Sequence, residues 1–398
     1  MKNLNNFQIK NKQVLFRADL NIPLVEGKIT DTARILAIKK SINKLLDQKN
    51  KIFILSHFGR PKGKINKKYS LKFICSTLEK ILEVKKIHFL ETFDSDSIRQ
   101  KIIQVKFGEI CLFENIRFNQ GEENLDLSFA KEISSFFDVF VNDAFSASHR
   151  NHTSITGFPK YLPAVAGYNL ISEIKKVNLI LNNNRKPNIA IIGGSKISTK
   201  IKLLKNLIKI FNTIAIGGAM ANTFLLAKNY KIGKSLVEKE LIIVAKEIEK
   251  KAKICECNII LPVDAVCANN IRDKKNINNA SIGDIQPDQM ILDVGEDTTK
   301  LITKAILKSK MLLWNGPIGA FETEPFDRST RTIAKTISIN AKKLNLEAYA
   351  GGGDTLSAIK LANANDGFSY LSNAGGAFLE WLEGNQSPGV IALKENNF

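Results

Sequence analysis

The sequence predicts an α/β protein with two doubly wound domains, each a parallel sheet flanked by helices, joined by a helical hinge. Short apolar runs rich in Ile, Val and Phe alternate with amphipathic stretches of helical periodicity. The alternation restarts after Pro187, which disfavours helix at the preceding residue. A length of 398 residues is sufficient for two hydrophobic cores.

In the first half, the apolar runs predict strands at 14–20, 51–56, 86–90, 109–113 and 139–142. Helices are expected at 31–47, 70–82 and 127–136. In the second half, strands are expected at 188–192, 213–216, 258–263, 311–314 and 347–350. The helices expected there are 197–210, 238–251, 300–309 and 329–343. Strands that alternate with helices favour parallel sheets covered on both faces.

These elements predict an N-terminal domain at 1–171, a helical hinge at 172–186 and a C-terminal domain at 187–384. Ligands of open α/β sheets bind beyond the carboxyl ends of the strands. Each half therefore has one predicted binding edge, and the simplest arrangement has both edges facing one cleft.

Composition narrows the class of protein. The five cysteines are scattered, which argues against a disulfide framework and favours a reducing compartment. The N-terminal segment has no apolar signal core and no apolar run approaches 18 residues, so we expect a cytoplasmic protein without a membrane partner. The net charge of +19 comes from lysines spread along the chain, which are typical of solvated faces rather than of a nucleic-acid site.

Arginine is rare: ten of the 58 basic residues are arginine, and six of these ten lie in the first 150 residues. Because arginine binds phosphate with a planar, two-pronged donor, each one is a candidate for anion binding. Most of them follow directly after a predicted strand or begin a helix, where free N–H groups also favour an anion. The first half therefore predicts a site for a small phosphorylated ligand. Its candidate residues are Arg17, Asp19, Asn21, Arg34, His57, Arg60, Arg117 and Arg150.

In the second half, four strands are each followed by a glycine cluster. Glycine allows backbone N–H groups to approach phosphate closely, and a helix start favours negative charge. Lys196 and Lys200 follow the first cluster and, four residues apart, are expected on one helix face. Asp354 follows the last cluster and supplies an oxygen suited to Mg²⁺. This half therefore predicts a nucleotide site, although the P-loop pattern is missing.

Three alternatives remain open from the residues alone. The arginine-rich edge could belong to an anion-binding protein without catalysis, and the basic composition to a nucleic-acid binder. His57, His149 and His152 could instead bind a metal, although no carboxylate has suitable spacing. Only turnover of a nucleotide distinguishes the enzyme from the first alternative.

Six motifs together resemble the phosphoglycerate kinase family, in order and spacing, from Val14 to Leu393. They are Arg17-x-Asp19-x-Asn21, Ser56-His57-x-Gly59-Arg60-Pro61, Glu114-Asn115-x-Arg117-Phe118, Gly193-Gly194-x-Lys196-x-x-x-Lys200, Trp314-Asn315-Gly316-Pro317-x-Gly319-x-Phe321-Glu322 and Gly351-Gly352-Gly353-Asp354-Thr355. The resemblance implies a glycolytic kinase that transfers a phosphoryl group between ATP and the carboxylate of 3-phosphoglycerate, and we expect a monomer. It also implies that residues 385–398 form a tail that returns to the N-terminal domain. Because the carboxylate of 3-phosphoglycerate is already ionised, direct in-line transfer needs no general base and no phosphohistidine.

The resemblance also implies a role for each matching residue. The candidates of the first half would hold 3-phosphoglycerate, with Arg17 supporting the site; Arg34 and Lys196 would be catalytic, and Asp354 would bind Mg²⁺. The nucleotide would contact Lys200, Gly217, Gly218, Gly295, Asn315, Glu322, Gly352, Gly353, Asp354 and Thr355. The chain departs from the family pattern at Ser195, where Ala is usual, in the loop 146–151, and after Gly295, where Pro is usual.

Overall fold

The computed structural model describes residues 1–182 and 185–398, which form two compact units. Unit 1 contains residues 1–175 and 386–398, and unit 2 contains residues 176–385. Among the described residues, each unit has one six-stranded sheet whose neighbouring strands are all parallel, with helices on both faces. The predicted α/β fold class is therefore confirmed. No helix in the described ranges is long and apolar enough to cross a bilayer.

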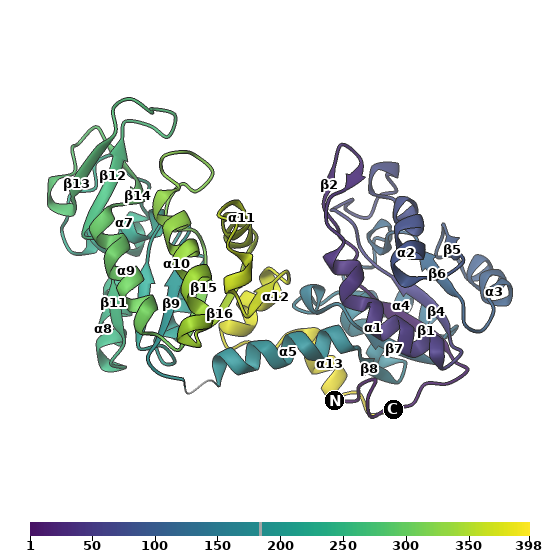
Figure 1. The fold of residues 1–398 in the computed structure, drawn as a ribbon. Coiled ribbons are helices and arrows are strands. Elements are labelled where there is room, and N and C mark those ends of the chain that lie inside the picture. The colour runs from purple at the N-terminus through teal and green to yellow at the C-terminus, as the bar shows by residue number, and fades with distance from the viewer. Residues whose placement is uncertain (183–184) are drawn as a thin grey trace. The chain divides into compact units, whose positions relative to one another are not determined.

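The sheet of unit 1 has the strand order β5-β6-β4-β1-β7-β8 (Figure 1). Its strands are β1 (Gln13–Arg17), β4 (Lys51–Leu55), β5 (Ile87–Leu90), β6 (Ile110–Phe113), β7 (Val139–Asn142) and β8 (Ala164–Ala166). Nearly all their residues are buried because helices cover both faces, which explains the continuous apolar runs. A short hairpin, β2 (Leu24–Val25) and β3 (Lys28–Ile29), precedes the first helix.

Alternation along β4 sends side chains to two separate cores. Ile52 and Ile54 join the apolar cluster formed with α1 and α2. Phe53 points to the opposite face, where it packs edge-on against Phe137 and near Phe113. The helices of unit 1 are α1 (Ala33–Asp47), α2 (Cys75–Leu82), α3 (Ser95–Gln104), α4 (Leu127–Ser134) and α13 (Pro388–Lys394).

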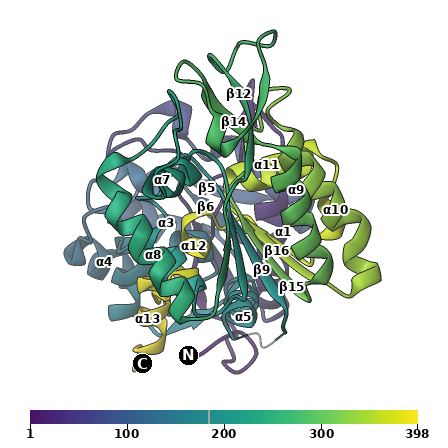
Figure 2. The ribbon, with the colours of Figure 1, turned by 90° about the vertical axis from the view of Figure 1, so that its left-hand side faces the viewer.

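The main sheet of unit 2 has the order β11-β10-β9-β15-β16-β17. Figure 2 shows its central strands between α7 and α8 on one side and α9 and α10 on the other. Its strands are β9 (Asn188–Ile192), β10 (Thr213–Ile216), β11 (Asn258–Ile260), β15 (Met311–Asn315), β16 (Glu347–Gly351) and β17 (Tyr370–Ser372). Its helices are α6 (Ile201–Leu207), α7 (Ala219–Ala227), α8 (Ile242–Ile254), α9 (Glu296–Lys308), α10 (Arg328–Leu344), α11 (Gly353–Leu361) and α12 (Gly376–Leu382).

A second, antiparallel sheet in unit 2 was not expected from the sequence. It pairs β12 (Asp264–Ala268) with β13 (Asn278–Ser281) and β14 (Met290–Val294). β13 consists of Asn, Ala and Ser and lacks the apolar pattern that marks a strand, whereas β14, Met-Ile-Leu-Asp-Val, is a short apolar run that the sequence analysis missed. This small sheet positions β14 beside the loops that follow the main sheet.

Helix α5 (Tyr168–Leu181) occupies most of the predicted hinge, and its residues are divided between the two units. Asn183 and Asn184, which belong to the same predicted hinge, lie outside the described residues. The C-terminal segment belongs to unit 1, where the Asn396 amide donates to the carbonyls of Pro159 (2.7 Å) and Leu162 (2.9 Å).

Candidate active site

The carboxyl ends of β1, β4, β6 and β7 bring most of the predicted anion-site residues of unit 1 together. The Asn21 side chain accepts the Gly59 N–H at 2.9 Å, and Arg117 donates to the Gly59 carbonyl at 2.7 Å. Asn21 follows β1, Gly59 follows β4 and Arg117 follows β6. Three strand ends separated by up to about a hundred residues in sequence therefore meet at one loop.

Asp19 links the same edge to α1 and to the loop after β7. It accepts hydrogen bonds from Arg34, in the first turn of α1, and from the Ser146 hydroxyl. Burial would raise the pKa of Asp19, but the charge of Arg34 and the hydrogen bond from Ser146 more than offset it, so the pKa lies below its ordinary value. Asp19 is therefore a fixed anion that orients Arg34.

Arg17 is 1% exposed, and its guanidinium contacts three neighbours. Nε donates to the Ser154 hydroxyl at 2.8 Å, one terminal nitrogen donates to the Ala18 carbonyl, and the other lies 3.3 Å from Nδ1 of His57. Burial holds the pKa of His57 well below its ordinary value. The charge of Asp19 opposes this shift, and the cations around His57 add to it. A neutral His57 can accept a hydrogen bond from Arg17, so it acts as a polar contact and not as a third positive charge.

Arg117 and Arg150 complete a cluster of cations with Arg17. Arg117 is 3% exposed, and burial lowers its pKa to about 10, so it stays charged at neutral pH. The positive charge of Arg150 acts on both Arg17 and Arg117, which places the three guanidinium groups near one another. Arg60 is exposed, and no contact joins it to this cluster in the described part of the chain.

Glu122 is a residue of this site that the sequence did not predict. It is fully buried, and its two oxygens accept from the Ser154 N–H (2.9 Å) and the Ser154 hydroxyl (2.6 Å). Ser154, in the π-helical turn Thr153–Gly157, thus connects the carboxyl group of Glu122 with Arg17. Two acidic residues in a loop are typical of a solvated turn, and only the fold reveals that the first of them is buried.

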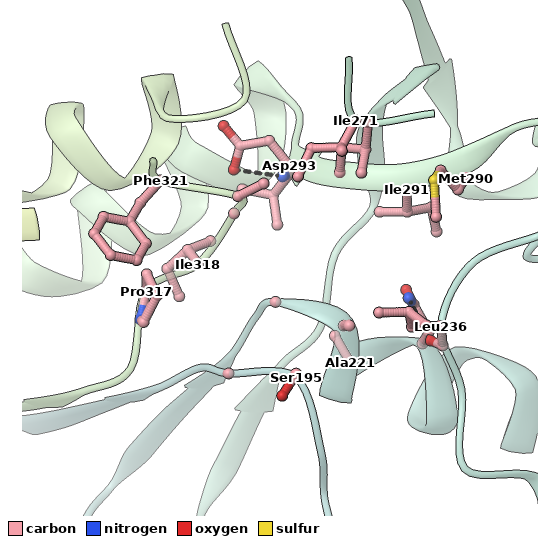
Figure 3. A pocket seen from close by; sticks show the side chains of 18 of the residues that line it. Ser195, Ala221, Leu236, Ile271, Met290, Ile291, Asp293, Pro317, Ile318 and Phe321 are labelled. Carbon is pink, nitrogen blue, oxygen red and sulfur yellow. Dashed lines mark hydrogen bonds between the residues drawn. The ribbon is translucent and has the colours of Figure 1, made fainter. Parts of the chain in front are cut away.

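In unit 2, the main site is a cavity of about 290 Å³ beyond the carboxyl ends of the strands. Figure 3 shows Pro317, Ile318 and Phe321 on one side, Ile271 and Met290 on the other, and Ser195, Ala221 and Leu236 below. Gly218, Glu322 and Asp354, all predicted from the sequence, are among the lining residues. The apolar character of most of the lining fits a flat, partly apolar ligand.

Two glycines allow the loops after β9 and β15 to touch. A Cβ atom on Gly193 would lie 2.0 Å from the Pro317 carbonyl oxygen, and one on Gly316 would lie 2.1 Å from the Gly193 carbonyl oxygen. Gly316 also has φ +98°, which side chains rarely adopt. Any side chain at either position would therefore push apart two walls of the cavity.

Other predicted nucleotide residues form a second group at the ends of β15 and β16. Lys200 donates to the Asn315 side chain, whose amide donates to the Gly351 carbonyl at 2.6 Å. The Thr355 hydroxyl accepts the Gly316 N–H at 2.7 Å. Burial lowers the pKa of Lys200, and the charges of Glu383 and Asp354 partly oppose this. Gly352 and Gly353 begin α11 beside these contacts, and a Cβ on Gly217 would meet Ile318.

Gly295 is not among the residues that line the cavity, although its neighbour Val294 is. It precedes the first turn of α9, and a Cβ atom there would lie 2.2 Å from a carboxylate oxygen of Asp264. Asp264 also accepts the Thr298 N–H at 2.8 Å. The structure therefore gives this glycine a role in packing α9 against β12.

The helix expected at 197–210 begins later, at Ile201, so the prediction that Lys196 and Lys200 share a helix face is wrong. The Glu238 carboxylate accepts the N–H (3.0 Å) and the hydroxyl (2.6 Å) of Ser198. The Thr199 hydroxyl donates to the Lys196 carbonyl at 2.9 Å. These side-chain bonds compete with the helical ladder and keep the segment in a turn, with Lys196 exposed.

Comparison with known proteins agrees with this architecture. The model of the phosphoglycerate kinase family matches residues 4–385. The chain belongs to the phosphoglycerate kinase family. It is 43% identical over 394 residues to the phosphoglycerate kinase of Brucella abortus, covering 99% of both chains. It is 45% identical over 401 residues to that of Orientia tsutsugamushi strain Ikeda, covering 99% of this chain and 97% of the relative.

A solved structure of phosphoglycerate kinase from Coxiella burnetii has a TM-score of 0.88 to this chain, with 38% identity and 98% of each chain covered. Membership in the phosphoglycerate kinase family makes the chain an enzyme, a kinase of glycolysis. The resemblance inferred from the six sequence motifs is thereby confirmed.

One further buried carboxyl group in this phosphoglycerate kinase lies against the cavity. Asp293, on β14, accepts the Val294 N–H (2.9 Å) and the Ser329 N–H (3.0 Å), and contacts the Ser329 hydroxyl. It thereby binds a free N–H group in the first turn of α10. Burial raises the pKa of Asp293 to about 7.

We predict that Asp293 makes the stability of unit 2 fall as pH rises from about 4 to 7. An unfolded Asp has a pKa of about 3.9, so in this range the native state holds a proton that the unfolded chain has lost; the free energy of unfolding then decreases by about 1.4 kcal/mol per pH unit. Asp293→Asn removes this slope. Urea unfolding followed by tryptophan fluorescence measures it, since both tryptophans, Trp314 and Trp381, lie in unit 2.

The matched control is Asp288→Asn, an exposed position in the same unit, which should keep the slope of the natural chain. A slope that persists unchanged in Asp293→Asn contradicts the assignment of this proton to Asp293.

Proposed function

We propose that this phosphoglycerate kinase binds 3-phosphoglycerate at the arginine cluster of unit 1 and ATP or ADP in the cavity of unit 2. The reaction of the family is phosphoryl transfer between 1,3-bisphosphoglycerate with ADP and 3-phosphoglycerate with ATP. The observation that best supports the assignment of unit 1 is that Arg17 and Arg117 meet at adjoining strand ends, where Arg17 lies 3.3 Å from His57 and Arg117 donates to the Gly59 carbonyl at 2.7 Å. A phosphorylated carboxylic acid suits such a group of arginines, because arginine forms strong paired hydrogen bonds with both phosphate and carboxylate.

The proposed residues of each site are those to which the family resemblance gives a role. The 3-phosphoglycerate site comprises Asp19, Asn21, Arg34, His57, Arg60, Arg117 and Arg150, with Arg17 in support. The nucleotide site comprises Lys200, Gly217, Gly218, Asn315, Glu322, Gly352, Gly353, Asp354 and Thr355. Gly295 is retained from the family resemblance alone, because it is not among the residues that line the cavity.

We propose that Asp354 holds the Mg²⁺ that accompanies the nucleotide. In the described ranges, no three His, Cys, Asp or Glu side chains gather to form a metal site. One exposed carboxylate at the start of α11 fits Mg²⁺, which takes few protein ligands and fills its coordination with phosphate oxygens and water. Bound there, the ion would neutralise phosphate charge during transfer.

The mechanism that we propose depends on positioning and charge. The acceptor carboxylate of 3-phosphoglycerate is already ionised, so no side chain needs to remove a proton. Asp19 holds Arg34, and Arg34 with the exposed Lys196 supplies positive charge to the phosphoryl group in direct in-line transfer. The neutral His57 is consistent with a binding role.

We also propose that the predicted domains act as the two substrate-binding parts. The N-terminal domain, residues 1–171, would bind 3-phosphoglycerate, and the C-terminal domain, residues 187–384, would bind the nucleotide. The hinge would comprise residues 172–186, and the tail, residues 385–398, would return to the N-terminal domain. Closure about the hinge would exclude water, which otherwise hydrolyses the acyl phosphate. We further propose a monomer in the cytoplasm; the five free cysteines accord with a reducing compartment.

The direct test of the proposed function is the formation of ATP from ADP and 1,3-bisphosphoglycerate by the purified protein with Mg²⁺. We expect turnover that EDTA abolishes and added Mg²⁺ restores. A chain that binds both substrates but forms no ATP would be an anion-binding protein, and the proposal would be wrong.

We predict that Ser154→Ala weakens 3-phosphoglycerate binding, because Arg17 loses the acceptor that orients it and Glu122 loses a donor. The KM for 3-phosphoglycerate should rise about tenfold, the size expected when buried partners lose a hydrogen bond. The KM for ATP should not change, and Ser154→Thr, which keeps the hydroxyl, should restore binding.

Ser134→Ala is the control for this experiment. Ser134 is buried in the same unit, and its hydroxyl has no hydrogen-bond partner among the described residues. If both alanine variants change the KM equally, Ser154 has no specific role in the site.

We predict that Lys196→Ala lowers kcat by about a hundredfold or more, the range found when a donor that stabilises transition-state charge is removed. Lys209→Ala is the control, since Lys209 is also exposed and lies near the end of α6. Steady-state kinetics in both directions measure the effect. Unchanged turnover in Lys196→Ala would exclude Lys196 from the catalytic role.

A further inference from the structure

We propose that Asn222 selects the base of the nucleotide by accepting a hydrogen bond from an exocyclic amino group, as found at position 6 of adenine. This inference rests on the proposed nucleotide site in unit 2. Asn222 belongs to none of the six sequence motifs, and the role would make it a specificity-determining residue of the cavity.

Asn222 lies on α7 and is among the residues that line the cavity. It is 1% exposed. Its Nδ2 donates to the Leu236 carbonyl at 2.9 Å. A carbonyl oxygen can only accept, so this bond fixes which end of the amide is nitrogen and which is oxygen.

The Oδ1 atom of Asn222 has no hydrogen-bond partner among the described residues. A buried acceptor without a donor keeps its full desolvation cost, and such atoms are few in folded proteins. Ala221, Leu236 and Ile291, which line the same cavity, have apolar side chains and offer no donor. A ligand that brings an N–H group to this atom would remove that cost.

The other polar groups of the lining are less suited to this task. The oxygens of Asp293 are already engaged by Val294 and Ser329. Ser195, Glu322 and Asp354 are exposed, so water can satisfy their hydrogen-bonding groups as well as a base can. Asn222 is therefore the candidate that combines burial with a missing partner.

A lone acceptor distinguishes purines by their group at position 6. An amino group at this position donates a hydrogen bond to the acceptor. A hydrogen atom forms no hydrogen bond with it, and an oxo group places a second acceptor against the first. Oδ1 is closed to solvent, so the lining must adjust for a base to reach it. Leu236, which is 61% exposed, is the neighbour that can move with little loss of packing.

The test compares ATP, purine riboside triphosphate and inosine triphosphate as phosphoryl donors to 3-phosphoglycerate. Formation of 1,3-bisphosphoglycerate is measured in each case. For the natural chain we expect kcat/KM for ATP to exceed that for either analogue by about tenfold or more, as one hydrogen bond to a buried group allows. In Asn222→Leu, of similar size without the acceptor, ATP should fall to the level of purine riboside triphosphate.

Asn340→Leu makes the same chemical change on α10, where Asn340 donates to the Thr336 carbonyl, and should keep the preference for ATP. Equal kcat/KM for the three nucleotides in the natural chain overturns the role of Asn222, as does a preference that survives in Asn222→Leu. The comparison on the natural chain needs no variant, so it stands even where Asn222→Leu fails to fold. Absence of any turnover with ATP would instead overturn the proposed function.

Discussion

Burial of the Arg17 guanidinium is the constraint around which unit 1 is organised. A buried cation is costly unless its donors and its charge are matched. Ser154 and the Ala18 carbonyl receive its hydrogen bonds, and Glu122 and Asp19 oppose its charge. These partners come from three separate segments of the chain, residues 18–19, Glu122 and Ser154, so satisfying one buried cation also fixes the segments that present Arg34, Arg117 and Arg150.

In unit 2, by contrast, backbone contacts hold together the loops that surround the site. The loops after β9 and β15 touch at Gly193 and Gly316, where no Cβ atom could fit. Beside this contact, the Ala320 N–H donates to the Leu292 carbonyl at 2.8 Å, which joins the loop carrying Glu322 to β14. The cavity therefore keeps its shape through main-chain contacts and leaves its few polar side chains available for a ligand.

The sequence predicted the strands and helices of the main sheets, which have a regular apolar pattern. It missed elements whose conformation depends on contacts with distant residues. Strands at 139–142, 188–192 and 213–216 agree with β7, β9 and β10, because strands buried on both faces are continuous apolar runs. In the small antiparallel sheet, β13 lacks that pattern and is recognisable only from its pairing with β12. The late start of α6 has the same cause: a carboxylate 40 residues away, Glu238, determines the local conformation.

The site shows the same division between what a motif encodes and what a fold creates. Arginine and glycine are recognisable because few other residues can do their work, so a scarce Arg17 or a paired Gly193 points to its role from sequence. Glu122 and Asn222 are ordinary residues whose importance comes from burial. The Glu122 carboxyl group is buried beside a cation, and the amide oxygen of Asn222 lacks a donor. Neither condition can be deduced before the positions of α7, the π-helical turn and the strand ends are known. The residues that orient a substrate are therefore harder to predict than those that bind its charge.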